Sequence, residues 1–370
     1  MRAFPAATLL LAVAQASASA ALNAEQETFD SHISKIERMR GVAEASIRTS
    51  WEQGTASQAV LEWDYKDYTI FGRSPFKTTG QLPVKALQYA LSAVTRQSAD
   101  GRLSQQINDA LDGAALDGAS SAPAVILGII TQPERKDYWS TALQKQLDYV
   151  LNTVPKTATG AISMRSDTAQ YWADGVYMGF PFIAYTGVVQ DNQTLVQIAF
   201  DNCKAYHDVL VVTGPFGPRN GWAAKGIIQV AATIERSQFK NQMQEQLITL
   251  KGYIQEIFDG VFPSLRSDGL LPNYVNKPDS TFGDSAGSSC LASVVYRAAK
   301  TWPEQFDKKK YLDVANAIRK TILNDLDDLG LMKSIVDPLK WDQKGVVSTE
   351  GQSFGLMMMA AWRDYFNLKC

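Results

Sequence analysis

Residues 179–189 read GFPFIAYTGVV, and residues 354–362 read FGLMMMAAW. Both stretches are apolar on more than one face when they are wound as helices, whereas a surface helix has one apolar stripe and one polar face. A helix formed from either stretch must therefore be covered on several sides. We expect both segments to be inner helices, enclosed by a further layer of helices.

Helical spacing of apolar residues continues along the rest of the chain, in segments separated by short Gly, Pro, Asn or Asp breaks. The strand-like runs Tyr68 to Phe71 and Val209 to Val212 have no clear hairpin partner. The pattern predicts one all-α domain, a closed ring of helical hairpins with six inner and six outer helices. The predicted helices cover residues 24–48, 53–64, 82–96, 101–112, 120–131, 137–152, 168–186, 192–211, 221–236, 238–259, 285–301, 308–328 and 350–367.

The N-terminus has the order of features typical of a secretory signal peptide. A basic start at Met1-Arg2 precedes an apolar run from Ala6 to Ala14, and Ala18-Ser19-Ala20 resembles a cleavage site. A membrane anchor needs roughly 20 apolar residues, and polar Gln15 interrupts this run early. We expect residues 1–20 to be removed and residues 21–370 to form a secreted, extracellular protein with no membrane partner.

The composition favours a globular protein and argues against a nucleic-acid partner. Hydrophobic residues make up 45% of the 370 residues and charged residues 20%, which allows a sizeable core. The 36 Lys and Arg nearly balance the 38 Asp and Glu, so the basic surplus of a nucleic-acid-binding domain is missing. The oligomeric state does not follow from these features.

Cysteine and histidine are both rare in this chain. Cys203, Cys290 and Cys370 allow at most one disulfide within a chain, and the sequence does not select the pair. With only His32 and His207, a zinc site or a Ser/His/Asp triad has little support. We therefore expect no metal and no cofactor.

Aromatic and acidic side chains gather beside glycines at the starts of the predicted helices. One such motif alone reads as a helix cap next to a core aromatic residue. Its recurrence along a ring of hairpins would bring these helix ends together at one mouth, where rings could stack on a ligand. The motifs are WEQG (51–54), LDG (116–118), YWADGVYM (171–178), NGW (220–222), FGDSAGS (282–288) and STEGQ (348–352).

The stretch YWADGVYMGFPF (171–182) resembles the signature of the unsaturated glucuronyl and rhamnogalacturonyl hydrolases, glycoside hydrolase families 88 and 105. The resemblance extends from WEQGT (51–55) through NGWAA (220–224) to EGQSF (350–354), in the same order as in the family. It implies an (α/α)6 toroid of six helical hairpins and suggests a fungal-type secreted member.

The resemblance also implies the roles of the site residues. Asp174 would be the catalytic acid/base and Asp117 its supporting carboxylate, with the ring of Trp172 as an apolar wall that keeps a proton available. The alternative for Asp117 is an N-cap of the helix predicted near Ser120. The residues expected to bind the sugar are Trp51, Gln53, Trp172, Tyr177, Arg219, Asn220, Trp222, Glu350 and Gln352.

In this family the substrate is an oligosaccharide made by a polysaccharide lyase, such as one from pectin or rhamnogalacturonan, and it carries a 4,5-unsaturated uronic acid at its non-reducing end. The resemblance implies hydration of that vinyl ether. This chain departs from the family pattern at Met164, near which members commonly carry a histidine. Two alternatives stay open: hydrolysis of a saturated glycan by two carboxylates on the same toroid, and glycan binding without turnover.

Overall fold

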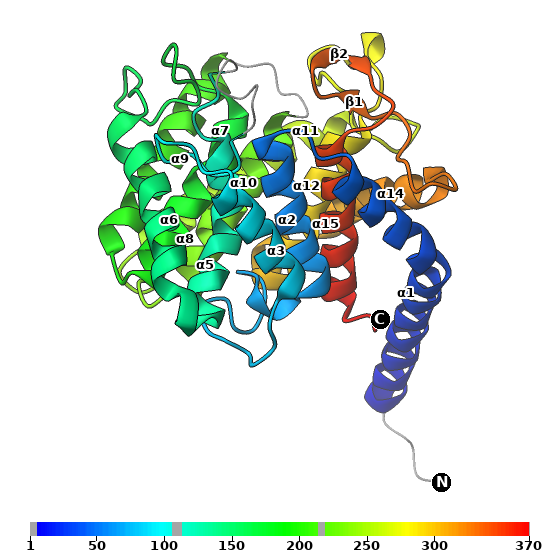
Figure 1. Cartoon of the computed structure of the whole chain (residues 1–370). Coiled ribbons are helices and arrows are strands. Elements are labelled where there is room, and N and C mark those ends of the chain that lie inside the picture. Colours follow the sequence, from blue (N-terminus) through cyan, green and yellow to red (C-terminus); the bar gives the residue numbers. More distant parts are fainter. Residues whose placement is uncertain (1–5, 106–112, 214–218, 370) are drawn as a thin grey trace.

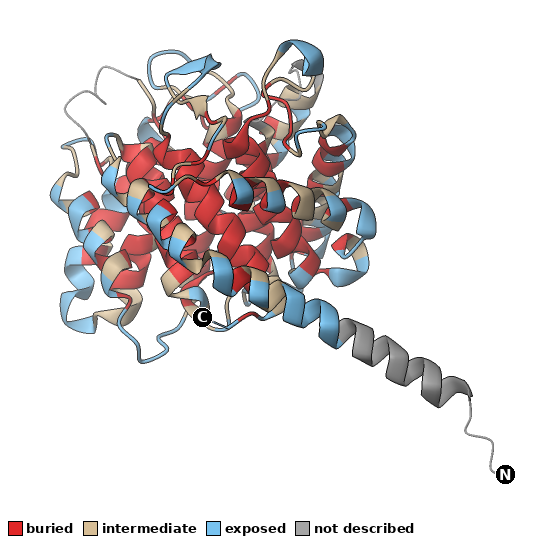
Figure 2. Cartoon of the chain, turned by 90° about the vertical axis from the view of Figure 1, so that its right-hand side faces the viewer, coloured by how far each residue is buried: buried red, intermediate tan, exposed pale blue. Residues whose placement is uncertain are grey.

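The computed structural model describes residues 6–105, 113–213 and 219–369, without the side chains of residues 6–18, 212, 213 and 219. Within these residues, six largely buried helices form an inner ring (Figures 1 and 2). Each contacts the next, and the last contacts the first. In ring order they are α2 (Ser50–Asp64), α5 (Ala122–Thr131), α8 (Phe180–Val189), α10 (Arg219–Arg236), α12 (Ser285–Thr301) and α15 (Thr349–Phe366).

A second set of more exposed helices surrounds this ring (Figure 2). Outer and inner helices alternate along the chain, and each outer helix packs on inner helices, as α9 does on α8 and α14 on α12. The (α/α)6 toroid and the single all-α domain are thus confirmed. The outer helices are α1 (Ala6–Ala45), α3 (Val84–Thr95), α6 (Lys136–Asp148), α9 (Gln193–Thr213), α11 (Gln244–Val261) and α14 (Lys309–Asp325).

The two apolar stretches of the sequence are inner helices, as predicted. Phe180 and Phe182 on α8, and Met357 to Met359 on α15, are all almost fully buried in one continuous core. Burial on every face leaves no room for a polar stripe, which explains the uniform composition of these helices.

One glycine is required where α10 packs against α7 (Ala173–Met178), the short helix that precedes α8. A Cβ atom on Gly226 would lie 2.2 Å from the carbonyl oxygen of Val176. No side chain fits at that distance, so glycine at this position lets the backbones of α10 and α7 approach each other closely.

The remaining elements connect the hairpins. Besides α7 and α13 (Pro303–Phe306), they are the single turns η1 (Lys66–Tyr68), η2 (Asp117–Ser121), η3 (Pro133–Arg135), η5 (Phe262–Ser264) and η6 (Pro278–Ser280), and the π-helical η4 (Tyr149–Thr153). Strands β1 (Val336–Asp337) and β2 (Lys340–Lys344) form an antiparallel hairpin just before α15. The sequence patterns did not predict this hairpin.

Two of the predicted helices are wrong in part. Residues 101–105 form a turn in which Asp100 accepts a hydrogen bond from the backbone N–H of Arg102 at 3.2 Å, an alternative to helix that Asp side chains favour; residues 106–112 lie outside the described residues. The first part of the predicted helix 168–186 is not helical: the backbone is irregular up to Trp172, and the carbonyl of Gln170 accepts a hydrogen bond from the N–H of Met164 at 3.0 Å. It then continues as α7 and α8, which meet at Gly179.

Smaller differences concern helix starts and strand-like runs. The helix predicted from residue 238 begins at Gln244, after turns in which the hydroxyl of Ser237 accepts from the N–H of Phe239. The run Val209 to Val212 lies inside α9, and Tyr68 to Phe71 forms the end of η1 and a turn. Tertiary packing therefore overrides the β-propensity of both runs.

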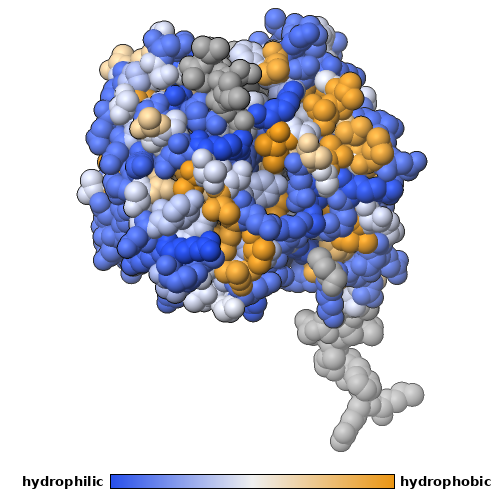
Figure 3. Space-filling view, in the orientation of Figure 1, coloured by the Kyte–Doolittle hydropathy of each residue, from blue (hydrophilic) through white to orange (hydrophobic). Residues whose placement is uncertain are grey.

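The surface in the view of Figure 3 is mixed, with apolar side chains near the region of the β1–β2 hairpin. Leu339 between the strands and Val346 just after them are 70% and 82% exposed. Among the described residues, no helix combines the length and apolar content needed to cross a bilayer.

Candidate active site

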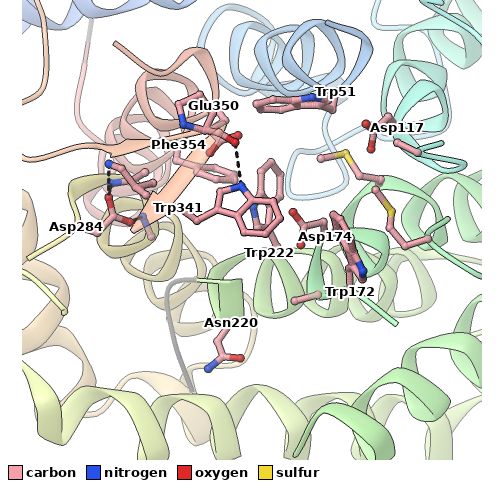
Figure 4. Close-up of a pocket in the computed structure, with 18 of the residues that line it drawn as sticks. Trp51, Asp117, Trp172, Asp174, Asn220, Trp222, Asp284, Trp341, Glu350 and Phe354 are labelled. Atoms are coloured by element: carbon pink, nitrogen blue, oxygen red, sulfur yellow. Dashed lines mark hydrogen bonds between the residues drawn. The ribbon is translucent and has the colours of Figure 1, made fainter. Parts of the chain in front are cut away.

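The starts of the inner helices surround a pocket of about 610 Å³ (Figure 4). Its wall combines residues from η2, α7, α10, α12 and α15 with residues of the β1–β2 hairpin. The expected convergence of helix starts is therefore present. Of the residues expected at the site, those that line the pocket are Trp51, Asp117, Trp172, Asp174, Asn220, Trp222 and Glu350.

Three expected sugar-binding residues do not line the pocket. Gln53 is buried and contacts the carbonyl of Tyr89 and the side chain of Arg96. Gln352 donates to the carbonyl of Gly330 at 2.7 Å and accepts from the N–H of Met332 at 3.0 Å. The hydrogen-bond partners of both glutamines also lie outside the pocket lining.

The third of these residues, Tyr177, is buried behind the pocket, where its ring packs 4.8 Å from that of Trp222. Arg219 was also expected to bind the sugar. It begins α10, and its side chain lies outside the described part of the chain.

Asp174 is the second residue of α7 and is half-buried. The extended Trp172 precedes the helix as its N-cap residue, so the indole and the carboxylate both reach the pocket. The free N–H groups of a first helical turn favour negative charge nearby. The start of α7 therefore places the Asp174 carboxylate at the pocket.

Asp117 is the first residue of η2 and is 6% exposed. The N-cap alternative fails, because α5 begins only at Ala122 and its N-cap residue is Ser121. Asp117 thus reaches the same pocket as Asp174, and in Figure 4 it lies on the side opposite Asp284 and Glu350. A supporting carboxylate is compatible with this position.

Aromatic rings form much of the pocket wall. Trp222 packs against Phe354 with ring centroids 4.5 Å apart and planes at 70°. The Nε1–H of Trp172 donates to the side chain of Gln170 at 2.7 Å, and this bond fixes its indole. Such flat, rigid surfaces suit the apolar faces of sugar rings.

The sequence did not reveal that the β1–β2 hairpin contributes to the wall. Trp341 on β2 lines the pocket, and its carbonyl accepts from the side chain of Asn273 at 2.7 Å. The Nε1–H of Trp341 donates to the carbonyl of Pro338 at 3.0 Å. A tryptophan close to a proline and a glycine in a polar run was the available signal, but it gave no pairing partner.

A comparison with known protein families matches the first half of the chain. Residues 35–212 match the model of Glycosyl Hydrolase Family 88. The matched part contains Trp51, Asp117, Trp172 and Asp174, on the first half of the ring. The protein is a glycoside hydrolase. No curated protein matches the chain by sequence.

Solved structures similar to the hydrolase share its fold. A possible member of glycoside hydrolase family 105 from Salmonella enterica serovar Paratyphi A has a TM-score of 0.70 and 12% identity, covering 91% of this chain and 94% of that one. A family 105 glycoside hydrolase from C. acetobutylicum has a TM-score of 0.63 and 13% identity, with 89% and 99% covered. An unsaturated glucuronyl hydrolase specific for heparin has 0.59 and 11%, with 93% and 97% covered.

Two further acids of the hydrolase lie at this pocket. Asp284 is the N-cap residue of α12, and its carboxylate accepts from the N–H groups of Ala286, Gly287 and Val336 at 2.7 to 3.2 Å. Burial raises the pKa of Asp284 in spite of these hydrogen bonds. The sequence analysis identified the motif FGDSAGS (282–288) that contains Asp284, but only the folded ring shows that Asp284 lines the pocket.

The environment of Glu350 strongly disfavours its ionised form. It lies in the first turn of α15 and is only 9% exposed. Burial, and then the negative charges of Asp174, Glu52 and Asp284, raise the pKa of Glu350 well above its ordinary value, and Arg48 opposes this only in part. The geometry thus favours a protonated carboxyl group at the pocket wall.

The described residues contain no group of three or more His, Cys, Asp or Glu side chains arranged to hold a metal ion. Cys203 on α9 and Cys290 on α12 are buried free thiols, and Cys370 lies outside the described residues. Neither thiol lines the pocket.

Proposed function

We propose that this hydrolase removes a 4,5-unsaturated uronic acid from the non-reducing end of lyase-generated oligosaccharides of the pectin or rhamnogalacturonan type. The observation that carries the proposal is the shared pocket of Asp174 and Asp117, which is walled by Trp51, Trp172 and Trp222. The family match over residues 35–212 and the neighbour described as an unsaturated glucuronyl hydrolase support the same chemistry.

In the proposed reaction, Asp174 acts first as an acid and then as a base. Its carboxyl proton moves to C4 of the C4=C5 double bond, and positive charge develops at C5 and the ring oxygen. Water adds to C5 while the Asp174 carboxylate takes up one of its protons. The resulting hemiketal opens at the ring oxygen, and the hemiacetal left at C1 then releases the aglycone. One water molecule is consumed and Asp174 is regenerated, so a single acid/base serves both halves.

The other residues of the pocket bind and orient the sugar. The rings of Trp172 and Trp222 offer apolar faces for stacking, and Asn220 supplies an amide that can bond hydroxyl groups. Asp117 supports Asp174 as a nearby carboxylate, because a second negative charge favours the protonated form of its neighbour. These residues come together because the inner helices begin around the same pocket.

We also propose that the hydrolase is exported as a fungal-type secreted enzyme after removal of residues 1–20. The basic start, short apolar run and small residues of this segment support export. N-terminal sequencing of protein recovered from the medium of a secreting host tests this. A mature chain that still begins at Met1 would contradict the cleavage.

An absorbance assay tests the reaction. The conjugated enol carboxylate of a lyase product absorbs in the ultraviolet, and hydration at C5 removes the conjugation. The wild-type protein should bleach this absorbance on at least one member of a panel of lyase-generated oligosaccharides, while releasing the aglycone. Cleavage of saturated glycosides without bleaching, or binding to the whole panel without turnover, would overturn the proposal.

A further inference from the structure

The acids on the Glu350 side of the pocket differ in what binds them. Glu52, beside this wall, accepts from the guanidinium of Arg48 at 2.6 Å and from the backbone N–H groups of Arg48 and Thr49. Asp284 accepts from three backbone N–H groups of the α12 cap and of β1. Both carboxylates are thus saturated by the fold and have no spare role in binding a ligand.

Glu350 is different. Its side chain lines the pocket, it is 9% exposed, and no hydrogen bond links its carboxyl group to any residue in the described part of the chain. Its backbone is fixed in the first turn of α15, where the N-cap hydroxyl of Ser348 accepts from the N–H of Gly351 at 3.1 Å. A buried polar group in this state is costly unless a ligand or water completes it.

The charges around Glu350 decide which protonation state suits a ligand. Asp174 on α7, Glu52 on α2 and Asp284 before α12 repel an ionised Glu350, the thiol of Cys290 lies on the neighbouring helix, and Arg48 is the attracting cation. An ionised Glu350 would also repel an anionic sugar. A protonated Glu350 avoids both repulsions and offers an O–H donor to the pocket.

We propose that Glu350, in its protonated form, donates a hydrogen bond to the carboxylate of the uronic acid bound in this pocket, and so selects an acidic sugar. This inference rests on the proposed function, because it assigns the group that recognises the acidic end of that substrate. An acid paired with a carboxylate forms a short, strong hydrogen bond. Recognition is then lost when the Glu350 proton is lost.

The test compares KM with kcat from about pH 4 to pH 9 for an unsaturated uronic disaccharide and its methyl ester. For the wild type, KM for the acid should rise with pH, approaching tenfold per unit once Glu350 is mostly ionised, because the substrate carboxylate stays ionised. For Glu350→Gln, whose amide N–H donates at every pH, the KM profile should be flat. Glu350→Ala should raise KM by about 10- to 100-fold at low pH.

Two controls make the outcome specific. The methyl ester has no carboxylate, so its KM should depend little on pH in the wild type and in Glu350→Gln. Glu304→Gln, a change of the same kind on the exposed part of α13, should keep the wild-type profile. A wild-type KM that does not change with pH, or a Glu350→Gln profile that equals that of the wild type, would overturn the inference.

Calorimetry separates this inference from the proposed function. If the wild type bleaches no unsaturated substrate, the proposed function fails, but binding of the same disaccharide can still be measured at about pH 5 and pH 8. A wild-type affinity that falls with pH beside a constant affinity of Glu350→Gln supports the role of Glu350. Equal affinities for acid and ester at pH 5 would overturn it, whatever the turnover. Circular dichroism melting shows whether each variant is folded.

Discussion

The indoles of Trp341 and Trp172 meet edge to face at the pocket, with ring centroids 5.9 Å apart and planes at 83°. Trp341 belongs to the β1–β2 hairpin and is 46% exposed, whereas Trp172 precedes α7 on a distant hairpin of the ring. The contact therefore joins two parts of the pocket wall and leaves the Trp341 indole partly exposed there.

Trp341→Ala should weaken substrate binding and leave the chemical step nearly unchanged. Loss of the edge-to-face contact and of a stacking surface is worth about 0.5 to 1.5 kcal/mol, so KM should rise roughly 3- to 10-fold. Steady-state kinetics on the bleaching substrate measure this, and Trp341→Phe should recover part of the loss. The control is Val346→Ala, an exposed position after the hairpin that does not line the pocket. A fall in kcat with unchanged KM would contradict a binding role.

Asp174→Asn should remove turnover while it preserves the fold. The amide has the shape of the acid but cannot donate and recover a proton, and loss of a general acid costs about 10²- to 10⁴-fold in rate. Because Asp174 serves both protonation and water activation, the upper end or beyond is expected in kcat. Near-normal kcat in the variant, with an unchanged melting profile, would show that another group is the acid.

Asp117→Asn should reduce kcat by less than Asp174→Asn does. It removes the nearby negative charge that favours the protonated acid, so the alkaline limb of the kcat/KM profile should also move to lower pH. The pH dependence of bleaching measures both effects. Asp137→Asn, at an exposed position in the first turn of α6, is the matched control and should change neither. A loss of kcat as large as that of Asp174→Asn would make Asp117 an equal partner in the chemistry.

Inner helices were predictable where the sequence is apolar on more than one face, as in α8 and the middle of α15. The β1–β2 hairpin was not predictable, because all five residues of β2 are exposed and lack an alternating pattern. A strand of that kind forms only through its tertiary partners, here including the Asn273 side chain that binds the Trp341 carbonyl. The periodicity of the sequence therefore predicted the ring of helices but not the β1–β2 hairpin, which forms another part of the pocket wall.

The site residues illustrate the same limit within a helix. Trp51 and Glu350 were predicted and line the pocket, but Gln53 and Gln352, each two positions later, do not. Side chains two residues apart on a helix point in directions that differ by about 200°. Gln53 therefore faces away from the side of α2 that carries Trp51, and Gln352 faces away from the side of α15 that carries Glu350. A sequence motif can thus indicate which helix begins at the pocket. The geometry of the helix then determines which residues of the motif face the pocket.

A buried ion network lies inside the ring and is separate from the pocket wall. Glu62 on α2 binds Lys225 on α10 at 2.8 Å and Arg297 on α12 at 2.9 Å, and Arg297 also binds Asp364 on α15 at 2.6 Å. All four side chains are at most 9% exposed. The network therefore ties four inner helices together with charges that water cannot screen.

Glu62→Gln should destabilise the fold by about 3 to 5 kcal/mol, because it leaves two buried cations short of their shared anion. Burial alone would raise the pKa of Glu62, but Lys225 and Arg297 outweigh it, so the folded pKa lies below the ordinary value of 4.5. The wild-type stabilisation from this group is thus complete above the unfolded pKa and is lost as pH falls through the lower folded value. Urea unfolding at about pH 7 and at about pH 3 measures this: the gap between wild type and Glu62→Gln should be large at pH 7 and smaller at pH 3. A gap that is equal at both pH values would show that the ionised carboxylate is not what holds the four helices.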